Sequence, residues 1–244
     1  MKYAVLMILI AVVVFVSCKK TNSSNASVLF YNATWSLPAI TAAWNGSEII
    51  TTAIAQGQSS GTADSPYAKV PAGTNLITLK AGTNTLLDKN IYAAASTGSS
   101  FIFFDTTIVA TPVFPVRILQ LTDDLSLPDT GQLKYRVLNL VPDPAVKVDI
   151  WLVNGTSDSM RLDTAGGFAG AAAVASTIQT FNTLPFHGGN YTVKVKKTAT
   201  EQVYISVADY PFAIKGIYSI IFSGLLTGTG STGFKLSVLH HPPQ

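Results

Sequence analysis

One pentapeptide has the residue types of a catalytic nucleophile. Gly57-Gln58-Ser59-Ser60-Gly61 fits the G-x-S-x-G pattern, in which a hydrolase presents its serine between a strand and a helix. Such a serine needs a base, and the chain has three histidines, His187 and the adjacent His240 and His241. The pentapeptide lies in a Gly-, Ser- and Gln-rich stretch without a strand-to-helix pattern. A serine hydrolase is therefore a distant alternative, and we expect no catalytic residue.

The histidine pair is a poor metal site. Adjacent residues on a strand point to opposite faces, so His240 and His241 would not ligate one ion together. Pro242 and Pro243 end the strand directly after them, which favours an exposed C-terminal tail. The chain has one cysteine, Cys18, so a cysteine-based metal site is not expected either. We expect neither a metal nor another cofactor.

Tryptophans and a turn carboxylate are the candidates for ligand contact. Trp44 and Trp151 lie in strand patterns, which favours core or half-buried packing. Trp35 occupies a turn and is the better candidate for stacking on a sugar or another flat ligand. Asp143, between two prolines, favours a turn-stabilising carboxylate, with a ligand contact as the alternative. Trp35 and Asp143 are our candidate binding residues.

Cys18 is explained by the residues before it. Lys2 is followed by an apolar run, Tyr3 to Val16, that is shorter than the roughly 20 residues of a bilayer-spanning helix and is typical of a secretory signal peptide. Phe15-Val16-Ser17-Cys18 resembles the lipobox of bacterial lipoproteins, in which the cysteine is acylated and becomes the first residue of the mature chain. The alternative is an ordinary signal-peptidase cut after Cys18.

The lipobox reading predicts a signal peptide over residues 1–17 and a lipidated polar tether over residues 18–26. Acyl chains on Cys18 would hold the protein on a membrane, since each buried CH₂ contributes about 0.8 kcal/mol. Lys19 stands where inner-membrane lipoproteins carry Asp, so the resemblance to lipoprotein sorting implies the outer membrane. The periplasmic and the surface face both remain open.

The composition is that of a folded protein, because 48% of the residues are hydrophobic and 12% are charged. The formal net charge is +3. The basic residues between Lys194 and Lys197 alternate with an apolar one, as on the solvated face of a strand. We therefore do not expect a nucleic-acid partner.

Apolar residues recur with a period of two along much of the chain, which is the period of half-buried strands. Residues 191–197, 203–207 and 234–238 show this alternation. Continuous apolar runs at residues 101–104 and 217–222 fit central strands. Gly, Pro, Asn and Asp punctuate the spaces between them. The pattern predicts an all-β protein.

The chain also repeats itself. "VLFYNATWSLPAITAAWNG" (residues 28–46) and "VLNLVPDPAVKVDIWLVNG" (residues 137–155) both begin with Val-Leu and end in Asn-Gly. Further on, "VPAGTNLITLK" (residues 70–80) answers "LPFHGGNYTVKV" (residues 184–195). Each copy is large enough for an independent sandwich core.

The repeat predicts two tandem immunoglobulin-like β-sandwich domains, over residues 27–121 and 133–244. They would be joined by residues 122–132, a polar segment with Pro and Gly that is typical of a linker.

The second copy is similar to the bacterial domain of unknown function 4397. Its pattern of a strand, Pro-Asp, Asn-Gly and a later Pro-to-Gly turn is matched at Pro142, Asp143, Pro144, Asp149, Asn154, Gly155, Pro185 and Gly188. The resemblance implies immunoglobulin-like sandwiches in exported, often lipid-anchored proteins, and it brings no activity with it.

Each copy has one long irregular connection, Ser47–Lys69 in the first and Thr156–Thr183 in the second. Long connections on a rigid sandwich are usual carriers of recognition. We expect a ligand-facing rim there, with extra edge strands as the alternative.

Three functions from different classes remain. The first is a non-catalytic, lipid-anchored cell-envelope protein that acts as a binding, adhesion or structural module for another envelope protein. The second is a glycan-binding lipoprotein for polysaccharide capture, and the third is the serine hydrolase.

Lipidation of Cys18 is directly testable. In a bacterial host, metabolic labelling with a fatty-acid analogue should mark the wild type and leave Cys18→Ala unlabelled, because the thiol is the acylated group. In-gel detection of the label measures this. An unlabelled wild type, or a labelled variant, would contradict the lipobox reading.

Overall fold

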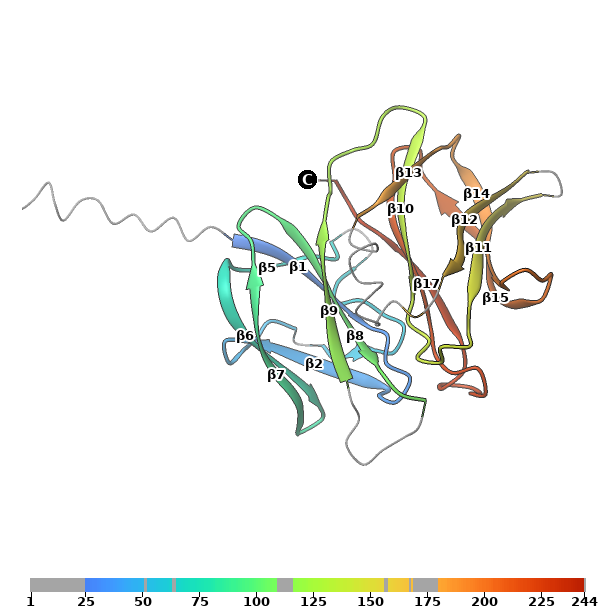
Figure 1. Cartoon of the computed structure of the whole chain (residues 1–244). Coiled ribbons are helices and arrows are strands. Elements are labelled where there is room, and N and C mark those ends of the chain that lie inside the picture. The colour runs from blue at the N-terminus through green and yellow to red at the C-terminus, as the bar shows by residue number, and fades with distance from the viewer. Residues whose placement is uncertain are drawn as a thin grey trace, which may run out of the picture.

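The computed structural model describes residues 25–50, 52–62, 65–108, 116–155, 158–166, 168 and 180–243. The predicted signal peptide and Cys18 lie outside the described residues. Within them the chain forms seventeen strands and no helix (Figure 1). Accordingly, no described helix is long and apolar enough to cross a membrane.

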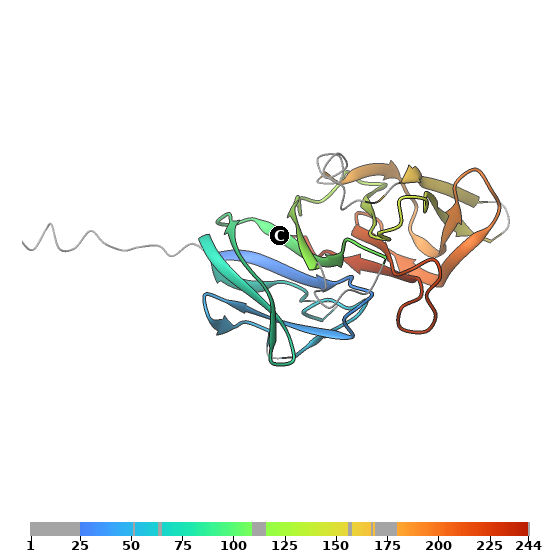
Figure 2. The same ribbon diagram turned by 60° about the horizontal axis from the view of Figure 1, so that its bottom comes forward.

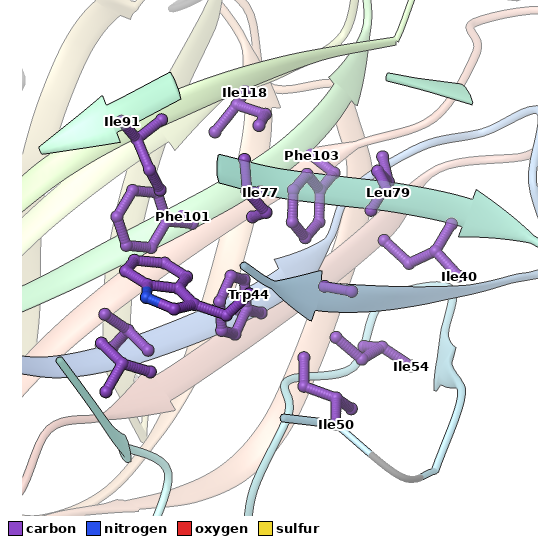
Figure 3. Packing of buried hydrophobic residues seen from close by; sticks show 14 of the residues in the cluster. Ile40, Trp44, Ile50, Ile54, Ile77, Leu79, Ile91, Phe101, Phe103 and Ile118 are labelled. Atoms are coloured by element: carbon purple, nitrogen blue, oxygen red, sulfur yellow. The ribbon is translucent and has the colours of Figure 1, made fainter. Parts of the chain in front are cut away.

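The first half folds into two packed sheets. One has the strand order β5-β1-β8-β9 and the other β3-β2-β6-β7, with the short β4 pairing with β2. The bounds are β1 Asn25–Asn32, β2 Ala39–Trp44, β3 Ser47–Glu48, β4 Ile54–Ala55, β5 Ala68–Pro71, β6 Gly73–Ala81, β7 Asn84–Ala93, β8 Gly98–Asp105 and β9 Val116–Asp123. Apolar side chains of both sheets meet between them, and Figure 3 shows Trp44 of β2 beside Phe101 of β8.

The second half repeats this architecture. Its sheets have the orders β13-β10-β16-β17 and β12-β11-β14-β15. The bounds are β10 Gln132–Asn139, β11 Val148–Asn154, β12 Asp158–Gly166, β13 Asn182–Pro185, β14 Gly189–Lys197, β15 Val203–Phe212, β16 Ile217–Ser223 and β17 Lys235–His240. A separate apolar core fills the space between the two sheets. The predicted all-β sandwich fold is therefore confirmed.

A buried asparagine marks the same place in each half. Asn32 ends β1 and accepts a hydrogen bond on Oδ1 from the backbone N–H of Thr34, at 3.1 Å. Asn139 ends β10 and accepts the same bond from Val141, also at 3.1 Å. Each side-chain amide also donates to a backbone carbonyl of the following loop. Both asparagines thus fix the chain where it leaves the first strand of its sandwich.

These asparagines correct the alignment of the repeat at its start. Since Asn32 corresponds to Asn139, Val28 corresponds to Tyr135 and not to Val137. The two halves still converge on Asn-Gly turns, because the segment between the asparagine and the turn is two residues longer in the second half.

The inner strands β8 and β16 are buried on both faces. Phe101 and Phe103 point into the first sandwich core, while Ile102 and Phe104 point to the opposite side of β8. On β16, Ile220 and Phe222 belong to the second core, and Ile221 faces away from it. Burial on both faces explains why these strands read as continuous apolar runs, and the prediction that they are central strands is confirmed.

The outer sides of the two inner sheets pack against each other (Figures 1 and 2). Their contact is a third apolar cluster, called here the interface cluster. It contains Leu29, Tyr31, Ala33, Ile102, Phe104, Leu119 and Leu121 from the first half and Leu138, Leu140 and Ile221 from the second. The sandwiches therefore share a buried face.

The segment predicted as a linker takes part in this packing. Thr122 and Asp123 belong to β9, and Gln132 opens β10. Leu125 is 5% exposed, so the connection packs against the protein after β9 ends. The domain bounds themselves remain a prediction.

Both long connections contain edge strands, as the alternative for them anticipated. Residues 47–69 contain β3, β4 and the start of β5. Residues 156–183 contain β12 and the start of β13, while their Ala-rich stretch at 169–179 lies outside the described residues.

Neighbouring isoleucines on β16 test the shared face. Ile220 lies in the second core and Ile221 in the interface cluster, and both are 0% exposed. We expect Ile220→Ala and Ile221→Ala each to lower the free energy of unfolding by about 2–4 kcal/mol, because each leaves a cavity among buried side chains. Urea titration followed by circular dichroism measures both values. A change below about 0.5 kcal/mol for Ile221→Ala, as at an exposed site, would contradict the packing of the halves.

Candidate functional site

The first long connection forms an open pocket of about 420 Å³, called here the rim pocket. Ile50 and Ile54 belong to the first sandwich core as well, and Figure 3 shows them next to each other at the margin of that core. The described lining residues are all uncharged: Ile49, Ile50, Thr52, Ala53, Ile54, Ala55, Gln58, Ser59, Ser60, Gly61, Thr62 and Ala68. The pocket thus combines an apolar base with hydroxyl and amide groups.

One side of the rim pocket is held against β1 by the G-x-S-x-G pentapeptide. The backbone N–H of Gly57 donates to the carbonyl of Asn32 at 2.8 Å. Ser60 donates its N–H to the carbonyl of Phe30 at 2.8 Å, and its Oγ accepts the N–H of Phe30 at 3.0 Å. After a turn at Gly57, the pentapeptide therefore runs along the edge of β1 and leads into no helix, which is unlike the strand-to-helix elbow of a hydrolase.

Ser59 lies in an isolated bridge with Tyr31. In the described part of the chain, no hydrogen bond joins its hydroxyl to a histidine. His187 is exposed in the turn before β14, and His241 is bonded to other side chains. The arrangement offers Ser59 as a polar group of the pocket wall.

The expectation that His241 lies in an exposed tail is wrong, because it is 0% exposed. After β17 the chain continues along β16, where the N–H of His241 donates to the carbonyl of Ile217 at 2.8 Å. The imidazole lies between the halves. β17 ends at His240, before Pro242 and Pro243 as expected, and the buried His241 lies between the strand and the prolines.

His241 belongs to a buried polar ring between the two halves. The ring contains Tyr67, Ser100, Asp123, Arg136, Ser219 and His241. Arg136 and Asp123 form an ion pair, with 2.7 Å between Nη2 and Oδ1, and their side chains are 1% and 0% exposed. Charges buried to this extent are tolerated when they are paired and hydrogen-bonded. We call this group the interface ring.

Two hydrogen-bonded paths lead from the arginine to the aspartate. On the shorter one, Arg136 Nη2 donates to Ser100 Oγ at 3.1 Å, and Ser100 donates to Asp123 Oδ2 at 2.7 Å. On the longer one, Arg136 Nε donates to Ser219 Oγ at 2.7 Å, and Ser219 lies 2.7 Å from His241 Nε2. His241 Nδ1 lies 2.7 Å from the Tyr67 hydroxyl, which donates to Asp123 Oδ2 at 2.7 Å.

The longer path assigns the tautomer of His241. An ionised carboxylate only accepts, so Tyr67 gives its proton to Asp123 and must accept from Nδ1–H of His241. Nε2 then accepts from Ser219, whose oxygen already receives Arg136 Nε–H. Each hydroxyl accepts once and donates once, which leaves His241 neutral.

Burial sets the pKa values in the ring. It lowers the pKa of His241 to about 3, with Asp123 opposing and Arg136 adding to the shift. Burial, followed by the charge of Asp123, raises the pKa of Tyr67 far above its ordinary value. Both groups therefore stay uncharged at neutral pH.

Aromatic side chains from both long connections cover the ring and the cluster beside it. Phe181 stacks on the Arg136 guanidinium, with 4.5 Å from the ring centroid to Cζ, and meets His241 edge-on at 5.6 Å. Phe168 meets Phe104 edge-on at 5.8 Å. Tyr67 also comes from a long connection, so parts of the segments predicted as ligand-facing rims serve to join the two halves.

The two candidate binding residues have structural partners. Trp35 is half-buried, and its backbone N–H donates to Asp105 Oδ2 at 2.7 Å while its indole N–H donates to the carbonyl of Thr107 at 3.0 Å. Asp143 accepts the N–H of Ala145 on Oδ1 at 2.9 Å, as a turn residue does. Neither residue lines the rim pocket.

The other tryptophans differ from each other. Trp44 is 2% exposed in the first core, as expected. Trp151 is half-buried on the outward side of β11, opposite to Ile150 and Leu152, which belong to the second core.

Over the described ranges, no group of three or more His, Cys, Asp or Glu residues could hold a metal ion.

The interface ring was not among the predicted sites. Its visible signal is Arg136, a charged residue between the apolar side chains of Tyr135 and Val137 in β10. A charge at such a position indicates a buried partner, which is Asp123 in the segment taken for a linker.

No family model and no curated protein matches the chain. Among solved structures, a leucine-rich repeat protein from Bacteroides thetaiotaomicron is 10% identical over 84% of this chain, with a TM-score of 0.20, and this chain spans 26% of its length. A protein named "putative adhesin" from Bacteroides ovatus is 7% identical, with 89% of this chain and 94% of that one covered and a TM-score of 0.19. Structural similarity at these TM-scores supports no conclusion about the fold or the function of this chain. Membership of the family of unknown function 4397 remains a prediction.

The neutral state of His241 makes stability depend on pH. Its pKa lies near 3 in the folded protein and at the ordinary 6.5 in the unfolded chain, so the unfolded chain binds more protons between these values. Stability contributed by neutral His241 is present above pH 6.5 and is lost as the pH falls. Between pH 6.5 and about 5 we expect the unfolding free energy to drop by about 1 kcal/mol per pH unit, and His241→Gln to remove most of that slope. Urea titrations across this range measure it. Equal slopes in both proteins would show that His241 is not held neutral.

Proposed function

We propose that this chain is a non-catalytic, lipid-anchored protein of the cell envelope that binds an uncharged, partly apolar segment of another envelope component through the rim pocket. Cys18 provides the anchor, and the outer membrane is the proposed location. The observation that carries the proposal is the pocket itself, which opens on one of the long connections expected to carry recognition.

The chemistry of the pocket supports this ligand class. Ile50 and Ile54 are buried side chains shared with the core, so their positions are fixed before a partner arrives. Gln58, Ser59 and Thr62 add polar groups that can hydrogen-bond to a neutral partner. A charged partner group would find no counter-charge among the described lining residues.

The hydrogen bonds that fix the pentapeptide favour a binding role over hydrolysis. Gly57 and Ser60 are tied to β1, and Ser237 of β17 donates from Oγ to the carbonyl of Gly57 at 3.0 Å. The loop is thus fixed by both halves of the protein, which favours a preformed surface. Ser59 contributes a hydroxyl to that surface and has no described base.

Filling the pocket tests the proposal. Ala53 is an exposed lining residue, and Ala53→Trp should cut recovery of envelope partners about fivefold or more, because the indole occupies the space that a ligand needs. The measurement is a pull-down from solubilised envelopes with quantitative mass spectrometry.

The matched control is Ala213→Trp, at an exposed alanine between β15 and β16 that is not part of the pocket lining. It should leave partner recovery unchanged. Unchanged recovery with Ala53→Trp, at the same thermal stability as wild type, would show that binding does not use the rim pocket.

A further inference from the structure

A row of side chains crosses the outward side of the sheet β12-β11-β14-β15. Trp151 of β11 pairs in register with Arg161 of β12 on one side and with Lys194 of β14 on the other. Cross-strand partners point to the same side of a sheet, and here the opposite side faces the second core. Because neighbouring strands lie about 4.8 Å apart, the two cationic residues start about 10 Å apart with the indole between them.

Two cationic side chains lie against the indole of Trp151. The guanidinium carbon of Arg161 lies 5.8 Å from the Trp151 ring centroid, and Nζ of Lys196 lies 5.2 Å from it. At such distances the positive charges are attracted to the electron-rich face of the indole. The contact with the indole restricts the long side chain of Arg161, which lowers the entropic cost of binding an anion there.

Two acidic residues, Glu201 and Asp149, lie near Lys196 at one corner of this sheet. Glu201 lies 2.6 Å from Lys196, and Asp149 is the register partner of Lys196 and accepts from the Thr198 hydroxyl at 3.2 Å. Within the described residues, no ion pair engages Arg161 or Lys194. Among the described side chains, Arg161 and Lys194 are therefore two positive charges of the row through Trp151 without an ion-pair partner.

We propose that this Trp151 face, made of Arg161, Trp151 and Lys194, binds an acidic polysaccharide. Carboxylates on alternate sugars would pair with Arg161 and Lys194, and the sugar between them would cover the exposed part of the indole. The face lies on the other sandwich from the rim pocket, so this proposal is independent of the function proposed for that pocket.

Two other anionic partners fit the observations less well. Nucleic acids carry closely spaced phosphates and need dense cationic surfaces, whereas this row offers two charges. A membrane surface would require the face to lie near the anchored end of the protein. The chain enters β1 at Asn25 on the first sandwich, and β11, β12 and β14 lie at the opposite end of the molecule (Figures 1 and 2).

The test measures affinity for polygalacturonate, with neutral dextran as the uncharged comparison, by isothermal titration of the full mature chain. The wild type should bind polygalacturonate and not dextran. The variant R161Q/K194Q should weaken binding by about tenfold or more, because two charge-assisted contacts are lost. The variant R161K/K194R keeps the charges and should retain most of the affinity, which separates recognition from damage to the fold.

The matched control is R117Q/K89Q, which removes the same charge from exposed positions of β9 and β7 in the first half. It should change affinity by less than about twofold, since distant exposed charges are screened. Equal losses in both glutamine variants would overturn the proposal, as would the absence of polygalacturonate binding. Stronger binding to phosphatidylglycerol vesicles or to single-stranded DNA, lost in R161Q/K194Q, would assign the face to that partner and overturn it too.

Discussion

The ion pair of Arg136 and Asp123 decides how the two halves of this protein fit together. Both charges are removed from water, which is costly unless every remaining donor and acceptor finds good geometry. Asp123 ends β9 of the first half and Arg136 lies in β10 of the second, so the pair forms only when the two inner sheets meet in one relative position. The apolar side chains of the interface cluster could slide past each other at small cost, but a hydrogen-bonded ring cannot.

Local patterns predicted most of the fold, and they failed where a second layer decides the environment. Alternation predicted the strands because it records which face of a strand is buried. The run from Phe101 to Phe104 indicated a central strand, but it could not show that Ile102 and Phe104 are covered by the other sandwich. Pro242 and Pro243 indicated where the last strand ends, but they could not show that the preceding His241 is buried between the two halves. The rim pocket lies on the first long connection, and that connection also carries Tyr67 of the interface ring, which no local pattern indicated.

The duplication of the sandwich places equivalent positions of the two halves opposite each other in this interface. Leu29 is the cross-strand partner of Ser100, as Arg136 is of Ser219. Ser100 pairs with Leu121, which lies two residues before Asp123. In the same way, Ser219 pairs with Leu239, which lies two residues before His241. Three pairs of equivalent positions therefore contribute to the interface: Leu29 and Arg136, Ser100 and Ser219, and Asp123 and His241. Only the serines are the same in both halves.

Because these equivalent positions carry different residues, each half fits the other half better than it fits a copy of itself. Two first halves facing each other in the same way would bury two Asp123 carboxylates without an arginine, and two second halves would bury two Arg136 guanidiniums without a carboxylate. A buried unpaired charge penalises both combinations, while the unlike combination satisfies every charge. Domains that arise by duplication carry the means to pair with the wrong copy in a neighbouring molecule. Here the charges that differ between the repeats favour assembly within one chain over exchange between chains.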